Sequence, residues 1–155
     1  TPILASHEGD PVQIRGVIDR VEADANGRVT VVDLKTGASA PSKNDVLEHA
    51  QLGVYQTAIQ LGALQEHPDT AGLSDDPAGA SLVYVGTSAK SPALRDQPAL
   101  GEDDWARTLI LEAAELMGHT EFTTRHVAGS AGLLGSCTLP EICPLCNEGR
   151  QVTEP

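Results

Sequence analysis

Two aspartates and a lysine in the first quarter of the chain have the residue types and spacing of a hydrolytic metal site. Asp19 lies in the stretch GVIDR, and Asp33 and Lys35 stand two residues apart in VVDLKTG. Side chains two residues apart on a strand share one face of the sheet, so the Lys35 ammonium would lie beside the Asp33 carboxylate. Two carboxylates from neighbouring strands can hold a hard divalent cation such as Mg²⁺. The lysine can then orient a water and stabilise charge in a phosphodiester transition state.

A third stretch, HAQLGVYQ, follows these two after a short polar segment. Gln51 and Tyr55 in it are four residues apart and therefore share a face of the predicted helix. In order and spacing the three stretches resemble the RecB-family branch of the PD-(D/E)xK nucleases, whose pattern reads G-x-x-D-R, D-x-K-T-G and Q-L-x-x-Y. The resemblance implies a Mg²⁺ or Mn²⁺ ion and a set of site residues: metal ligands Asp19, Asp33 and the carbonyl of Leu34, catalytic Lys35, and DNA-orienting Gln51 and Tyr55. An isolated D-x-K would more simply be a cross-strand ion pair on a surface hairpin.

Within this branch the chain is most similar to the C-terminal nuclease domain of AdnB-type helicase-nuclease subunits, relatives of AddAB and RecBCD that process DNA double-strand breaks. The resemblance implies upstream helicase domains and a second helicase-nuclease subunit as partners, with a single DNA strand delivered by the helicase as the substrate. It also implies an initial helix upstream of residue 1 that supplies another metal ligand; His7 is the alternative within the chain. The competing hypothesis is a catalytically silent, iron-sulfur-stabilised scaffold or DNA-end-holding module of a repair complex.

The three cysteines form a second constellation near the end of the chain. Cys137, Cys143 and Cys146 are spaced C-x5-C-x2-C, and thiolates this close in an intracellular protein indicate metal or cluster ligation more than disulfides. Several members of the family that the chain resembles carry an iron-sulfur cluster on three C-terminal cysteines and one upstream cysteine, although their C-terminal spacing, C-x2-C-x5-C, runs in the opposite order. Three interpretations remain open: a [4Fe-4S] cluster with a fourth cysteine upstream of residue 1, a zinc ion completed by that cysteine or His126, or reduced structural thiols.

The charge of the chain restricts how it could meet DNA. Its 155 residues carry 22 acidic and 10 basic side chains, a formal net charge of −12. Nucleic-acid affinity comes largely from Lys and Arg displacing counterions from phosphates, so this balance opposes unaided binding. No apolar run reaches the roughly 18 residues that a membrane span needs, and no signal-peptide pattern is present. We therefore expect a cytoplasmic protein with no membrane partner.

The elements that must position the site follow from local patterns. Alternating apolar residues predict a strand over 12–22, Asn26-Gly27 predicts a hairpin turn, and a β-branched run predicts a second strand over 29–35. Helical spacing of apolar residues predicts a helix over 45–64 with Asp45 as its N-cap. The remaining expectations are a strand over 80–87, a polar connection over 88–104, and a helix over 103–117 that buries Trp105, Leu109, Ala113 and Leu116.

These elements predict an α/β fold. We expect a restriction-endonuclease-like core with a central mixed sheet flanked by helices, on which the helix carrying Gln51 and Tyr55 packs against the strands of the site. The core would span residues 1–125. Residues 126–155 would form an irregular, cysteine-containing C-terminal lobe of the same domain.

Overall fold

The computed structural model describes residues 3–5, 11–87, 90–101 and 104–118. All of them lie in one compact unit, Thr1–Gly118. In chain order its elements are β1 (Ile3–Ala5), β2 (Pro11–Gln13), β3 (Arg20–Ala23), β4 (Val29–Lys35), α1 (Ala50–Gln60), β5 (Pro77–Tyr84), β6 (Ala93–Pro98) and α2 (Trp105–Gly118).

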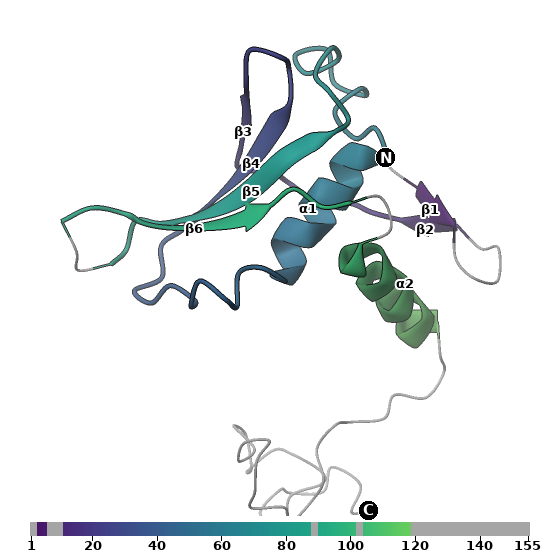
Figure 1. Ribbon diagram of the computed structural model, residues 1–155. Helices are drawn as coiled ribbons and strands as arrows, with labels where there is room; N and C mark the ends of the chain where they lie inside the picture. The colour runs from purple at the N-terminus through teal and green to yellow at the C-terminus, as the bar shows by residue number, and fades with distance from the viewer. Residues whose placement is uncertain (1–2, 6–10, 88–89, 102–103, 119–155) are drawn as a thin grey trace, which may run out of the picture. The chain divides into compact units, whose positions relative to one another are not determined.

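Four strands form a mixed sheet in the order β3-β4-β5-β6, and β1 pairs with β2 in a separate antiparallel hairpin. Strands β3 and β4 are antiparallel, as are β5 and β6, whereas β4 and β5 run parallel. A parallel pair requires a crossover connection, and α1 lies within it. Figure 1 shows α1 on one face of the sheet, where it contacts β4 and β5, with α2 packed beside it. The predicted α/β fold with a central mixed sheet is confirmed for these residues.

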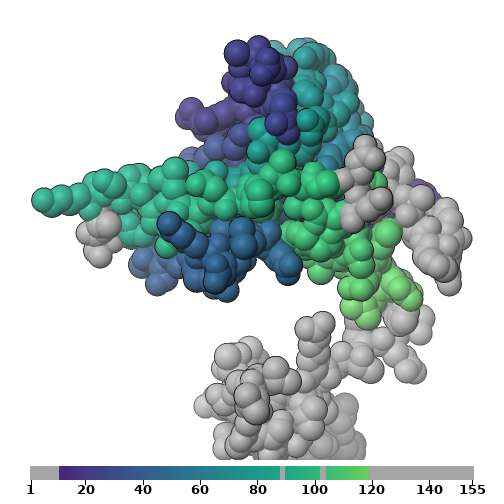
Figure 2. Space-filling model, in the orientation of Figure 1, coloured from purple at the N-terminus to yellow at the C-terminus, as the bar shows by residue number. Residues whose placement is uncertain are grey.

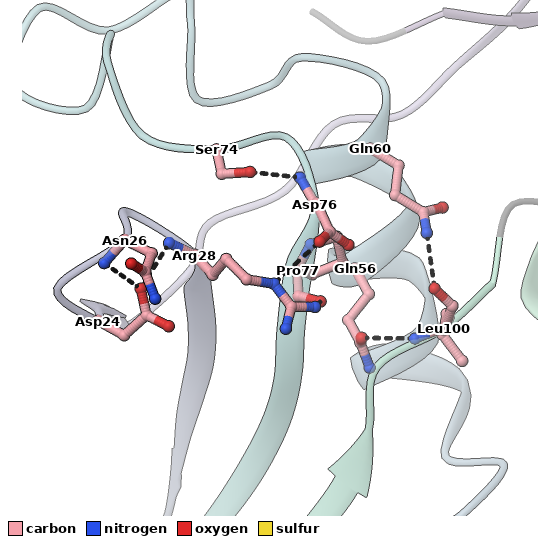
Figure 3. A network of polar contacts seen from close by, with 9 residues as sticks. All are labelled: Asp24, Asn26, Arg28, Gln56, Gln60, Ser74, Asp76, Pro77 and Leu100. Carbon is pink, nitrogen blue, oxygen red and sulfur yellow. Dashed lines mark hydrogen bonds and ion pairs between the residues drawn. The ribbon is translucent and has the colours of Figure 1, made fainter.

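The predicted turn between the first two strands of the sheet is confirmed. Gly27 has φ +79°, a left-handed conformation that suits glycine. The Asp24 carboxylate accepts hydrogen bonds from the backbone N–H groups of Asn26 and Arg28, at 2.8 and 3.0 Å. The Arg28 guanidinium then donates to the carbonyl of Pro77 at 3.0 Å, which attaches the turn to the start of β5 (Figure 3).

The core is aliphatic. The side chains of β4 alternate, so Val29 and Val31 face α1 on the side that also carries Asp33. The core cluster consists of Val29, Val31, Val46, Leu52, Ile59, Leu64, Ala80 and Leu82. At the sheet end near Lys35 this apolar layer gives way to polar side chains, and the candidate site lies there.

The predicted strand over 12–22 is wrong in its extent, because residues 14–19 belong to no strand. Val12 and Val21 lie in two separate elements, β2 and β3. In the register of β3 and β4, Arg20 pairs with Val32, so a longer β3 would place residue 18 opposite Leu34. Instead the Asp19 carboxylate accepts the hydrogen bond from the N–H of Leu34 at 2.9 Å. A side chain thus replaces the ladder partner where β3 begins.

The predicted helix over 45–64 is shorter than expected, and Asp45 is not its N-cap. Residues 43–48 form turns, and α1 begins after His49, which makes no side-chain capping bond. Asp45 instead pairs reciprocally with Ser42: its N–H donates to the Ser42 hydroxyl at 3.1 Å, and its carboxylate accepts from the Ser42 N–H at 3.2 Å. This local pairing stabilises a turn in place of the first helical turn.

The segment expected to be a connection over 88–104 contains a strand, β6. Prolines at both ends and the polar run RDQ argue against a strand, but edge strands tolerate both. The predicted α2 is present with its buried face rotated: Ala106 and Ile110 are buried, whereas Leu109 and Leu116 are exposed. None of the helices in the described residues is long and apolar enough to cross a membrane.

Candidate active site

Asp33 and Lys35 meet at the end of β4, on the face covered by α1. Asp33 is 3% exposed, and its Oδ2 lies 2.6 Å from the Lys35 Nζ, whose side chain is 30% exposed. The alternation of β4 carries both side chains to one face, since they follow Val29 and Val31 at intervals of two residues. A buried carboxylate is therefore held beside a partly accessible ammonium group.

Gln51, in the first turn of α1, bridges this ion pair. Its side-chain oxygen accepts a hydrogen bond from Lys35 Nζ at 2.7 Å, and its Nε2 donates to Asp33 Oδ1 at 2.8 Å. The network assigns the orientation of the amide, because the reversed amide would point its oxygen at a carboxylate. The same Nε2 donates to the Tyr55 hydroxyl at 2.8 Å, which places the two helix residues on one face as the spacing predicts.

The segment before β3 joins the cluster through two bonds. The Tyr55 hydroxyl donates to the carbonyl of Val17 at 2.9 Å, and the Asp19 carboxylate accepts from the N–H of Leu34. Asp19 is thus attached to the peptide that directly follows Asp33. The structure therefore brings together all six residues that the sequence selected from its first three stretches, although they come from β4, α1 and the segment before β3.

The environment of this cluster shifts the pKa values of Lys35 and His49. The short contact with the Asp33 carboxylate raises the pKa of Lys35 above its ordinary value of 10.5, against an opposing effect of burial. Lys35 is consequently an ammonium group at neutral pH and a hydrogen-bond donor. Burial lowers the pKa of His49 below 6.5, and the Lys35 charge lowers it further, so His49 is neutral at pH 7.

His49 is a site residue that the sequence reasoning missed. It lies two residues before Gln51, and its ring is close enough to feel the charges of both Lys35 and Asp33. Its Nδ1 is buried without a hydrogen-bond partner. Its position two residues before Gln51 could have indicated a place near the site. A single histidine at the start of a helix is, however, equally typical of a residue with no role in a site.

The donor set at this place fits a hard divalent cation. Asp33 is a buried carboxylate whose Oδ2 lies 2.6 Å from the Lys35 ammonium, so this end of β4 already stabilises a positive charge. Asp19 supplies a second carboxylate one peptide away, and both are the oxygen ligands that Mg²⁺ and Mn²⁺ accept. Within the described ranges no group of three or more His, Cys, Asp or Glu side chains is placed to hold a metal ion.

Comparison with known protein families agrees with this geometry. Residues 2–144 match the model of the PD-(D/E)XK nuclease superfamily. The chain therefore belongs to this superfamily of metal-dependent nucleases, and its mixed sheet and helices fit the restriction-endonuclease-like fold. No curated relative matches the chain.

Other predicted site residues lie outside the described part of the chain. Cys137, Cys143 and Cys146 are among them, as are His126 and His7. The iron-sulfur and zinc interpretations, and the C-terminal lobe over 126–155, remain predictions from the sequence.

Proposed function

We propose that this chain is the Mg²⁺- or Mn²⁺-dependent nuclease domain of a RecB-family helicase-nuclease, and that it hydrolyses phosphodiester bonds in single-stranded DNA. The observation that carries the proposal is the cluster of Asp19, Asp33, Lys35 and Gln51 in a chain of the PD-(D/E)XK superfamily. The proposal extends to an AdnB-like role in double-strand-break processing, on the motif resemblance alone.

In this proposal each residue has a distinct role. Asp19 and Asp33 hold the ion with the carbonyl of Leu34, and the ion when bound supplies Lewis-acid stabilisation of the phosphate charge. Lys35 enters the reaction as an ammonium group, because its pKa is raised. It therefore donates a hydrogen bond to the attacking water or to a phosphate oxygen and does not itself remove a proton.

Gln51 determines where the Lys35 ammonium can point. By accepting one bond from Lys35 and donating another to Asp33, it keeps the lysine next to the carboxylate that would carry the ion. Tyr55 holds Gln51 in turn and anchors the segment before Asp19. Orientation of the DNA strand by these two side chains is the further role that the resemblance implies.

The negative net charge of the chain supports a nuclease to which another protein delivers the DNA strand. With a net charge of −12, the domain has little general attraction for a polyanion. A helicase that delivers one strand into the site would provide the local concentration that the nuclease itself does not. The same partner would keep the acidic surface away from the DNA path.

The proposal is tested by cleavage of a labelled single-stranded oligonucleotide with Mg²⁺ and with Mn²⁺. Asp33→Ala should abolish cleavage and weaken Mn²⁺ binding measured by electron paramagnetic resonance, because it removes a metal ligand. Lys35→Ala should lower kcat by about 100-fold or more, the order expected for one electrostatic donor, while Mn²⁺ still binds.

Glu48→Gln is the matched control, since Glu48 is an exposed acid just before the same helix. This variant should retain both cleavage and Mn²⁺ binding. Full cleavage by Asp33→Ala would refute the assignment of the metal site. Metal binding without cleavage by the wild-type protein would favour the silent scaffold.

A further inference from the structure

Two buried glutamines join the helix of the site to the edge strand of the sheet. Gln56 in α1 is 0% exposed and Gln97 in β6 is 2% exposed, and Gln56 Nε2 donates to Gln97 Oε1 at 2.9 Å. Burying an amide is unfavourable unless its polar atoms are paired, so each of these side chains requires defined partners. The partners lie on both sides of the pair and connect it to the site.

Gln97 holds the turn that leads into α1. Its Nε2 donates to the carbonyl of Val46 at 2.9 Å and makes longer contacts of 3.3 Å with the carbonyls of Leu47 and His49. The Val46 carbonyl also closes the turn before α1 by accepting from the His49 N–H, and the His49 carbonyl accepts from the Gly53 N–H in the first turn of the helix. A helix start is usually fixed by a capping side chain, but His49 provides none and the first turn has no acidic residue. The start of α1 is thus held by a side chain from a strand about fifty positions later.

Gln56 attaches the middle of the same helix to the segment after β6. Its Oε1 accepts from the N–H of Leu100 at 3.1 Å, and its Nε2 also contacts the carbonyl of Pro98 at 3.2 Å. Figure 3 shows Gln56 and Gln60 both directed at Leu100 from α1. Gln60 makes an equivalent link nearer the end of the helix, through the carbonyls of Leu100 at 3.0 Å and Gly101 at 3.3 Å.

The start of α1 is also where the site is most sensitive to displacement. Gln51 lies two residues after His49, and its amide makes contacts of 2.7 to 2.8 Å with Lys35, Asp33 and Tyr55. Hydrogen bonds of this length do not survive a shift of about 1 Å with good geometry. A misplacement of that size in a catalytic constellation can reduce turnover by about 100-fold.

We propose that Gln97, paired with Gln56, is a positioning residue of the active site: it sets the start of α1 and thereby holds Gln51 over the Asp33–Lys35 pair. The inference rests on the proposed nuclease function for its effect on turnover. Its effect on the geometry of Gln51 is independent of that function. It assigns a role to β6, an element that carries none of the motif residues.

The test compares Gln97→Met with Gln60→Met in the full protein. Methionine is close to glutamine in size and removes the polar contacts. Gln97 links β6 to Gln56 and to the turn before α1, whereas Gln60 links the end of α1 to the segment after β6. We expect both variants to be less stable. Gln97→Met should also lower kcat on a single-stranded oligonucleotide by about 10- to 100-fold, with KM changed less than about twofold, whereas Gln60→Met should retain the wild-type kcat.

A second readout does not depend on catalysis. The side-chain amide resonances of Gln51 in ¹⁵N NMR spectra should shift in Gln97→Met and stay in place in Gln60→Met. If Gln97→Met does not fold, Gln56→Met should give the same pattern through the other member of the pair. Equal losses of kcat in the Gln97 and Gln60 variants, or unmoved Gln51 signals in Gln97→Met, would overturn the inference and leave the nuclease function intact. A wild-type protein that does not cleave, with Gln51 signals that still move, would overturn the function alone.

Discussion

At the scale of residues, the site is a buried carboxylate and an ammonium group joined by one side-chain amide. Asp33 is buried next to Lys35, and Gln51 donates to one and accepts from the other. Because the carboxylate raises the pKa of Lys35, the lysine carries its charge throughout the neutral range. That charge reaches His49, whose imidazole is neutral beside it.

The pKa of His49 should therefore lie below 6.5 and should respond to Lys35. We expect ¹H-¹⁵N NMR titration to give a depressed value in the wild-type protein and a higher one in Lys35→Met, because one positive neighbour is removed while burial remains. The native pKa is lower than the unfolded one, so His49 contributes stability that is present above pH 6.5 and is lost as the pH falls from 6.5 through the native pKa. An unchanged His49 titration in Lys35→Met would show that the two side chains do not interact.

At the scale of elements, α1 joins every part of the site, and its position depends on close packing against α2. Gly53 faces this contact: a Cβ built there would lie 2.7 Å from Trp105 Cη2 and 3.0 Å from the Cβ of Ala106. The indole can rotate, but the Ala106 Cβ moves only with the backbone of α2. The absence of a side chain at Gly53 therefore sets the distance between the two helices.

Gly53→Ala should destabilise the protein although alanine is the better helix former. The substitution favours α1 by about 1 kcal/mol, but overpacking costs about 1–3 kcal/mol. We expect the free energy of unfolding in urea to fall by about 1 kcal/mol, the difference between these two effects. Gly72→Ala is the control, since nothing lies within 4 Å of a Cβ there. A stability gain in Gly53→Ala would mean that α2 moves away from α1 at little energetic expense.

At the scale of the molecule, an acidic chain carries a site for a polyanionic substrate. Figure 2 shows the β5–β6 hairpin beside residues 36–49 on one face of the molecule. Arg95 in β6 joins the two segments by donating a hydrogen bond to the carbonyl of Pro41 at 2.6 Å. One of the few cationic side chains is thus used within the fold, which leaves still less positive charge for phosphate contacts.

Unaided binding of single-stranded DNA should accordingly be weak. By fluorescence anisotropy in EDTA, which prevents hydrolysis, we expect a Kd weaker than about 10 µM at about 150 mM NaCl, within the range of purely non-specific binding. The logarithm of affinity should vary little with the logarithm of salt concentration, since few phosphates are neutralised. Tight binding with a steep salt dependence would instead show that the chain carries its own path for the DNA strand.

The sequence by itself determined the chemistry of this protein and the strand that bears it. Asp33 and Lys35 share a face because alternation along a strand is a local property, and the Asn26-Gly27 turn is equally local. The order of the three motifs was enough to predict the superfamily, which the match over residues 2–144 confirms. Gln51 and Tyr55 meet because a four-residue spacing closes one helical turn.

The tertiary structure decided where the strands and helices begin and which long-range hydrogen bonds fix those boundaries. β3 begins at Arg20 because the Asp19 side chain pairs with Leu34, and α1 begins after His49 with the carbonyls before it paired to Gln97. Both boundaries depend on hydrogen bonds between residues distant in the chain, which leave no periodic signal near the boundary itself. β6 was missed for the same reason: its buried glutamine is stable there only because α1 and the turn before it supply its hydrogen-bond partners.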